Sequence, residues 1–210
     1  MVNIIKVTSS VLLLLLLVGS FNSLTAQQRF EAGIVLGVTA AQINGDNSAQ
    51  FNKLGITAGL KVNTILTSKS DLIIEILLSQ RGSQTELFPR SGALQQTIHL
   101  DYIQVPVLFN YKDWLSDEED YYKMHFQGGL SYGRLFNTRF DNSPIEEAGP
   151  FFRKDDISWM AGITFFANEH LGFFTRYNRS INLLFKNSAS NPNVNSLLSY
   201  FLSFGANYVF

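Results

Sequence analysis

The residues of this chain that could carry chemistry are ionisable side chains that recur on one face of alternating segments. They are Glu31, Lys61, Glu75, Arg81, His125 and Arg176. Two carboxylates and three fixed cations can form a network of ion pairs, and buried charges need such partners because an unpaired one is strongly destabilising. We expect Glu75 to pair with Arg176 or Arg81, and Glu31 with Lys61. Such a network can act as a polar plug that fixes strand register, or as a gated or proton-conducting path.

The histidines also suggest an enzyme. His99 and Asp101 are spaced to face the same way, and a hydrolase would need a serine nucleophile within hydrogen-bond reach of them. Ser83, Ser91 and Ser131 are available, but no spacing singles one out. We therefore interpret His99 and Asp101 as a polar pair at an interface and assign no catalytic residue. No His/Glu cluster has metal-ligand spacing and no glycine-rich phosphate loop follows a strand, so no metal and no cofactor are predicted.

The elements that must position these side chains are eight segments in which apolar residues alternate with small or polar ones. A period of two residues is typical of a strand with one apolar face. Each segment is long enough for the roughly 9–11 tilted residues that a membrane-spanning strand needs. The segments are residues 29–39, 54–64, 71–82, 100–111, 121–133, 156–166, 171–181 and 199–210.

The connections between these segments alternate in length. Only TSKS and ANEH join the second to the third and the sixth to the seventh segment, KDWLSDEED is of medium length, and the other four connections are long. An up-and-down barrel would thus carry both termini and the short turns at one end and all long loops at the other, as bacterial outer-membrane barrels do. We therefore predict an all-β fold, an eight-stranded antiparallel up-and-down transmembrane β-barrel.

The alternation alone does not say which face points inward. Small residues suit the crowded interior of a narrow barrel, and glycines gather on the polar face of these segments. They are Gly33, Gly37, Gly55, Gly59, Gly129, Gly162, Gly172 and Gly205. We therefore expect the polar face to line the interior and the aromatic, apolar face to contact lipid. Pro106 lacks a donor for the strand ladder, so we expect a bulge or a local gap in pairing there.

The two ends of the chain predict its compartment. Residues 1–26 combine Lys6, an apolar run and Ala26 at a plausible cleavage point, the parts of a cleavable secretory signal peptide. Residues 27–210 form the barrel domain. The alternation continues to Phe210, so the last strand is expected to pair with the first and close the barrel. The chain has no cysteine, and its net charge of −1 argues against a nucleic-acid partner.

These segments resemble a known family. GITAGLKVNTIL, DLIIEILLSQRG, LDYIQVPVLFNY and FFTRYNRSI are similar to stretches of the PorT-like outer membrane β-barrel family of Bacteroidota, over essentially the whole mature chain. The resemblance implies an outer-membrane barrel with periplasmic termini, and a link to secretion by analogy only. The C-terminal pattern of Phe204, Ala206, Tyr208 and Phe210 resembles the signal that such barrels present to the insertion machinery.

Three functions follow as hypotheses. The first is a small non-enzymatic outer-membrane barrel with a side-chain-filled interior. It would act through external loops or periplasmic turns as an interaction or assembly component. Its expected partners are outer-membrane lipid, the barrel insertion machinery and a protein at the external loops. The alternatives are a rim-active enzyme that modifies lipid A or a surface substrate, and a soluble periplasmic lipocalin-like binding barrel.

Overall fold

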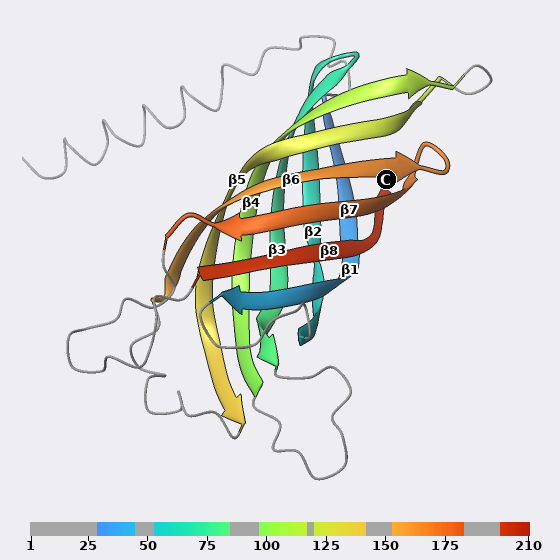
Figure 1. Cartoon of the computed structure of the whole chain (residues 1–210). Coiled ribbons are helices and arrows are strands. Elements are labelled where there is room, and N and C mark those ends of the chain that lie inside the picture. The colour runs from blue at the N-terminus through green and yellow to red at the C-terminus, as the bar shows by residue number, and fades with distance from the viewer. Residues whose placement is uncertain (1–28, 45–52, 85–96, 117–119, 142–152, 183–197) are drawn as a thin grey trace, which may run out of the picture.

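The computed structural model describes residues 29–44, 53–84, 97–116, 120–141, 153–182 and 198–210, and these form a closed antiparallel barrel of eight strands (Figure 1). The predicted signal peptide, residues 1–26, lies outside the described residues. The strands are β1 Phe30–Asn44, β2 Lys53–Thr67, β3 Ser70–Gln84, β4 Thr97–Leu115, β5 Tyr122–Asp141, β6 Asp155–Phe166, β7 Leu171–Ser180 and β8 Leu198–Val209.

Each strand pairs with its neighbours in sequence, and the last strand closes the barrel on the first. β8 pairs with β1 from Val209 opposite Gly33 to Leu198 opposite Asn44. The backbone amide of Phe210 also donates to the carbonyl of Ala32 at 2.9 Å. The prediction that the C-terminal segment belongs to the closing ladder is therefore confirmed.

The two ends of the barrel differ. At one end, which we call the turn end, lie the start of β1, the end of β8 and the short β2–β3 and β6–β7 connections (Figure 1). The β2–β3 connection is a two-residue turn at Ser68 and Lys69. The other end, which we call the loop end, holds the ends of β1, β3, β5 and β7. The predicted arrangement of termini and short turns at one end is thus confirmed.

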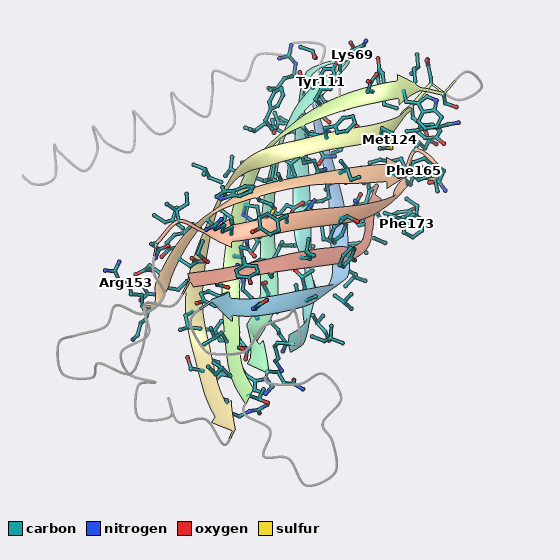
Figure 2. All side chains as sticks on the ribbon, in the orientation of Figure 1. Lys69, Tyr111, Met124, Arg153, Phe165 and Phe173 are labelled. Carbon is teal, nitrogen blue, oxygen red and sulfur yellow. The ribbon has the colours of Figure 1, made fainter. Side chains whose placement is uncertain are left out.

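The apolar face points outward, as predicted. Leu60 at the centre of β2 is 62% exposed and its cross-strand neighbour Ile76 is 60% exposed, whereas Lys61 and Glu75 beside them are buried. A chain that exposes a continuous belt of large apolar side chains and encloses its charges needs a hydrocarbon environment. Figure 2 shows aromatic and aliphatic side chains, Tyr111, Phe165 and Phe173 among them, on the outer wall.

Several strands extend beyond the predicted segments. Residues 40–44, 112–115 and 137–141 were expected in connections, but they belong to β1, β4 and β5. The alternation weakens there because a strand that projects beyond the lipid has no need of an apolar outer face. Pairing continues in the same ladders, with a register shift between β4 and β5 at Asp101/Tyr102.

The expectation for Pro106 is confirmed on one side of β4. Ladder partners between β3 and β4 run to Ile74 opposite Val107 and resume at Leu77 opposite Gln104, so Pro106 lies in a gap without a shift in register. On the other side Pro106 stays opposite Ser131 of β5. The missing amide donor is therefore accommodated by the loss of local pairing rather than by a bulge.

Candidate functional site

The first layer of the barrel interior is an ion pair between Glu75 of β3 and Arg176 of β7. Arg176 Nη1 and Nη2 donate to Glu75 Oε2 and Oε1 at 2.6 and 2.9 Å, and Nε donates to Gln127 Oε1 at 3.1 Å. Gly162 of β6 makes room for this side chain, since a Cβ there would lie 2.6 Å from Arg176 Cγ. The structure thus brings together one of the expected pairs, in the bidentate geometry that fits both charges best.

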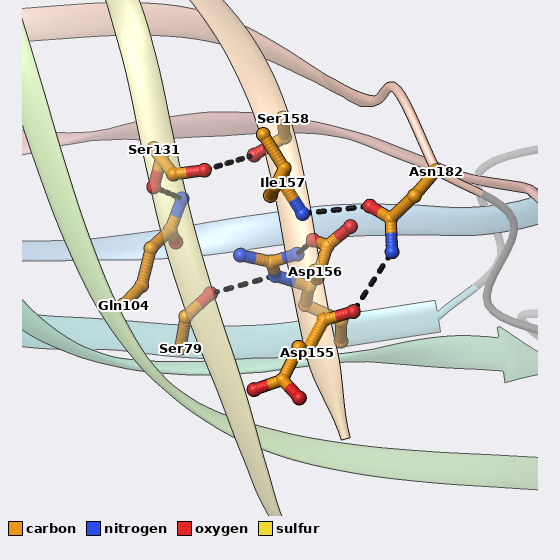
Figure 3. Close-up of polar contacts among 9 residues, drawn as sticks. Ser79, Gln104, Ser131, Asp155, Asp156, Ile157, Ser158 and Asn182 are labelled. Carbon is orange, nitrogen blue, oxygen red and sulfur yellow. Dashed lines mark hydrogen bonds and ion pairs between the residues drawn. The ribbon is translucent and has the colours of Figure 1, made fainter. Parts of the chain in front are cut away.

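The second layer lies toward the loop end and is built around Arg81 of β3. Its Nη1 donates to Asp156 of β6 at 2.7 Å, and both side chains are almost completely buried. The guanidinium also lies over the rings of Tyr102 and Phe201, 4.6 and 4.2 Å from their centroids. Figure 3 shows the polar contacts around Asp156. Arg81 was expected to compete for Glu75, but it pairs with a carboxylate that the sequence analysis had not included.

Gln104 and Ser131 extend this layer across β4 and β5. Gln104 Nε2 donates to Ser131 Oγ at 2.7 Å (Figure 3). Ser131 is buried in this contact, so it does not face the outer rim, where a hydrolase nucleophile would be needed.

An apolar cluster packs beside the Glu75–Arg176 layer. Val35, Leu77 and Phe174 form a buried cluster, and the space left among these side chains and their neighbours is only about 10 Å³. The Phe174 ring fits over Gly37 and Gly205, where added Cβ atoms would lie 3.1 and 2.8 Å from Phe174 Cζ. A volume this small holds no more than about one water molecule, so the gap among these side chains cannot hold a continuous column of water.

The expected pair of Glu31 and Lys61 does not form. The register of β1 and β2 places Glu31 opposite Asn63, and Lys61 opposite Gly33. Glu31 Oε2 therefore accepts from Asn63 Nδ2 at 3.1 Å. Lys61 is buried beside its cross-strand neighbour Glu75, whose two oxygens are taken by Arg176. The prediction was wrong because adjacent strands were known, but their register was not.

The turn end of the barrel contains a cavity of about 530 Å³, which we call the vestibule. Its lining includes Glu31, Asn63, Asp71, Lys112, His125 and Glu169. Lys112 Nζ lies 2.9 Å from Asp71 Oδ1, and Asn110 Nδ2 donates to Asp71 Oδ2 at 3.1 Å. The vestibule reaches charged side chains of the interior from the turn end of the barrel.

His125 lies in the vestibule wall with both ring nitrogens engaged. Its Nδ1 lies 3.2 Å from Asn110 Nδ2, and its Nε2 lies 3.1 Å from the carbonyl of Tyr122. The amide nitrogen of Asn110 can only donate and the carbonyl oxygen of Tyr122 can only accept. The network therefore assigns a neutral ring with its proton on Nε2. The ring also packs against Phe166, with centroids 4.4 Å apart. His125 is thus a wall residue and is not a member of the Glu75–Arg176 ion pair.

The candidate hydrolytic residues are not assembled into a catalytic geometry. Asp101 Oδ2 accepts from Asn137 Nδ2 at 2.8 Å, and His99 Nε2 lies 3.4 Å from Lys53 Nζ. Ser83 is buried. Ser91 lies outside the described residues. Within the described part of the chain, no three His, Asp or Glu side chains are placed to hold a metal ion.

The residues of the C-terminal pattern lie on the outer wall. Phe204, Tyr208 and Phe210 are exposed, and the rings of Tyr208 and Phe210 meet with centroids 5.9 Å apart. His170 of the β6–β7 turn holds this end, because its Nδ1 lies 2.9 Å from the carbonyl of Val209 and its own carbonyl accepts from the Val209 amide at 2.8 Å.

The sequence analysis missed several interior charges, among them Asp71, Lys112 and Asp156. Asp71 and Asp156 are the first residues of the predicted segments 71–82 and 156–166, and Lys112 directly follows the segment 100–111. All three share the inward parity of their segment, so applying that parity to the segment ends would have found them. Their partners would still have required the strand register and the shape of the closed barrel.

The comparisons with known proteins agree with this architecture. Residues 25–186 match the family model described as outer membrane protein beta-barrel domain. No curated protein matches the chain in sequence. No helix in the described residues is long and apolar enough to cross a membrane.

Solved structures of similar fold include Ail, the attachment invasion locus protein of Yersinia pestis. It is 16% identical, with a TM-score of 0.51, and the match covers 87% of this chain and 100% of that one. Neisserial surface protein A is 12% identical with a TM-score of 0.48, over 87% and 98% of the two chains. OprG of Pseudomonas aeruginosa is 12% identical with a TM-score of 0.45, over 86% and 95%. The family match spans most of the sequence, and the chain belongs to the outer membrane protein beta-barrel domain family.

Proposed function

We propose that this protein is a non-enzymatic outer-membrane barrel with a sealed interior that acts through its two ends as an interaction or assembly component. One observation carries the proposal: the interior is filled by two buried ion-pair layers together with the apolar cluster Val35, Leu77 and Phe174. A continuous aqueous path does not pass such a cluster, so the plug interpretation of the interior charges is favoured over the conducting one. The protein would then act through the surfaces at the two ends of the barrel.

Orientation in the membrane is part of the proposal. Family membership indicates the outer membrane, and we infer that the turn end faces the periplasm and the loop end the exterior. This orientation is supported by the short turns at the end that holds the start of β1 and the end of β8. Residues 1–26 would be removed on export, and the outer face of β8, with Phe204, Ala206, Tyr208 and Phe210, would be read by the insertion machinery.

A narrower assignment, to the PorT-like branch with a role in secretion, rests on the resemblance of four sequence stretches alone. Deletion of the gene, followed by comparison of the proteins in the culture medium, tests it. Loss of a defined set of secreted proteins supports the role, and an unchanged set removes it while leaving the barrel proposal intact.

The sealed interior is tested by conductance. The full chain, refolded and inserted into planar lipid bilayers, is expected to add no ionic current above that of the lipid. Leu77→Ala with Phe174→Ala removes most of the apolar cluster and serves as the positive control, since it is expected to raise the current. Discrete channels in the unaltered protein would overturn the proposal of a plugged barrel.

The interaction role is tested by crosslinking in cells. A photo-reactive residue is placed at exposed Lys69 in the β2–β3 turn or at exposed Lys154 before β6, one at each end of the barrel. A specific crosslinked protein at either position supports the proposal. The absence of any crosslink at both positions, with the barrel folded and inserted, would contradict it.

A further inference from the structure

The vestibule at the turn end has an excess of negative charge. Among its lining residues, the carboxylates of Glu31, Asp71, Asp120 and Glu169 face the single ammonium of Lys112. That ammonium is committed to Asp71 at 2.9 Å. Glu169 lies 3.4 Å from His170 Nε2, and the buried Lys61 interacts electrostatically with Glu31, but Lys112 is the only lysine or arginine among the described lining residues. A concave site with charge of one sign concentrates counter-ions of the other sign.

The hydrogen-bond donors of the vestibule wall are largely used within the wall itself. The Asn63 amide donates to Glu31 Oε2 at 3.1 Å, and the opposite orientation would set two oxygen atoms against each other. Asn63 Oδ1 is therefore the free end of the group, and it is buried with no hydrogen-bond partner. Asn63 is only 5% exposed and lines the cavity. Its Oδ1 oxygen is closed to a water molecule, so the side-chain group that Asn63 directs along the wall is its amide nitrogen, which is already used by Glu31.

The next residues inward repeat the pattern. The two hydrogens of the Asn110 amide are directed at Asp71 Oδ2 and His125 Nδ1, 3.1 and 3.2 Å from the nitrogen, while Asn110 Oδ1 is buried without a partner. The proton of His125 is used on the carbonyl of Tyr122. These donors are thus already paired within the wall and are not available to an anionic ligand.

The size and walls of the vestibule fit an organic cation. Its volume of about 530 Å³ falls within the roughly 300–1,000 Å³ of ligand pockets. Tyr121, Tyr122 and Phe166 contribute aromatic rings to the lining, and such rings attract guanidinium and ammonium groups. A small hydrated metal ion would not use these rings, and no metal-binding trio is present among the described residues.

We propose that the vestibule binds a guanidinium or ammonium group, presented by a basic side chain of a protein that docks on the turn end. This inference rests on the proposed function, in which the ends of the barrel make its contacts. A protein source is favoured over a free cation because the cavity opens at the rim beside the exposed turn residue Glu169, where a docking surface would surround it. The side chain would enter past Glu169 and place its charge near Glu31.

The test uses the full chain refolded in detergent micelles and a matched pair of probes. Binding of the tripeptide acetyl-Gly-Arg-Gly-amide is measured by isothermal titration calorimetry beside the same peptide with citrulline, which keeps the shape of arginine and removes its charge. We expect the arginine peptide to bind at least about tenfold more tightly. Equal binding of the two peptides, or no binding of the arginine peptide, would overturn the proposal.

Variants locate the site. Glu31→Gln and Glu169→Gln keep the size of each side chain. Each is expected to weaken the binding of the arginine peptide by roughly two- to fivefold. Asp155→Asn removes an exposed carboxylate at the loop end and should leave its affinity unchanged. Heat-dependent gel migration verifies that each variant is folded. An equal loss in Asp155→Asn would show non-specific charge attraction and contradict the proposal.

Binding of spermidine, a free organic cation, distinguishes the two possible sources of the positively charged group, a side chain of a docking protein and a free cation. Tight binding of spermidine together with no binding of the tripeptide would overturn the docking partner as the source. Binding of the tripeptide supports it. Failure of this test leaves the conductance result unaffected, so the vestibule and the sealed barrel are judged separately.

Discussion

At the scale of single residues, the interior of this barrel is organised by carboxylates that each receive a defined cation. Glu75 receives Arg176, Asp156 receives Arg81 and Asp71 receives Lys112. The arginines lie on aromatic rings as well, since Arg176 Cζ is 4.6 Å from the Phe174 ring centroid. Because these pairs are withdrawn from water, each member depends on the other more strongly than in a surface pair.

Removing one member of the Glu75–Arg176 pair should therefore be costly. Glu75→Gln leaves the guanidinium buried without its counter-charge, and we expect the free energy of unfolding in lipid vesicles to fall by about 3–5 kcal/mol. The measurement is urea unfolding followed by tryptophan fluorescence. The double variant Glu75→Leu with Arg176→Met removes both charges and should recover most of the loss.

A matched control is the pair of Arg134 and Asp155, joined at 2.6 Å but about half exposed at the loop end. Arg134→Gln should leave the unfolding midpoint close to that of the unaltered protein, because exposed pairs contribute little. If Glu75→Gln were as harmless as Arg134→Gln, the interior pair would not stabilise the fold and this account of the charged layers would be wrong.

At the scale of the strands, close approach of neighbours depends on glycines that face the interior. A Cβ on Gly205 of β8 would lie in contact with the carbonyl oxygen of Leu36 on β1 and 2.8 Å from Phe174 Cζ. Gly205 and Gly37 face each other across the seam that closes the barrel. Their lack of side chains lets the Phe174 ring cover the seam from the inside.

We therefore expect Gly205→Ala to impair closure of the barrel. The fraction that shows heat-dependent gel migration after refolding should fall. Gly128→Ala is the control, because a Cβ at Gly128 would meet only the carbonyl oxygen of Met160, at 3.9 Å. Equal folded fractions for the two variants would contradict the role assigned to the seam.

The elements also show how far the sequence alone could be used. Alternation identified all eight strands and their inward faces, because lipid outside and a filled interior impose a strict period of two. It placed the ends of β1, β4 and β5 too early, since that requirement stops where the strands leave the lipid. Strand register was the property that the sequence did not predict. Glu31 was expected to pair with Lys61, but the register of β1 and β2 places it opposite Asn63, two residues further along β2.

At the scale of the whole molecule, the outer belt and the enclosed charges define an object that is stable only in lipid. Leu60 lies at the centre of that belt, between the cross-strand neighbours Ile34 and Ile76. All three are exposed. A charged residue there would have to lie unsolvated in hydrocarbon or draw water into the bilayer.

Leu60→Arg should accordingly destabilise the inserted protein by about 2–4 kcal/mol, as for a charge at the bilayer midplane. Leu66→Arg, close to the β2–β3 turn, should cost only about 0–1 kcal/mol because the side chain can reach the interface. Urea titration in vesicles measures both. Equal effects at the two depths would contradict the assignment of the apolar face to lipid.

The sequence by itself determined the class of the fold, the number of strands, the face that meets lipid and the asymmetry of the two ends. Each of these is a local property, because alternation and loop length can be read along the chain without knowing what lies across the barrel. The parity of Glu75 and Arg176 within their segments also assigns both side chains to the interior from the sequence alone.

Only the tertiary structure decided which charges meet and which spaces remain. Arg81 of β3 meets Asp156 of β6, 75 residues further along the chain, because closure of the barrel and the registers of the strand pairs from β3 to β6 bring them together. The vestibule was likewise invisible in the sequence, since its walls come from both termini of the barrel and from three turns. Ion pairs and cavities depend on distances through space, and those are set by the closed barrel as a whole.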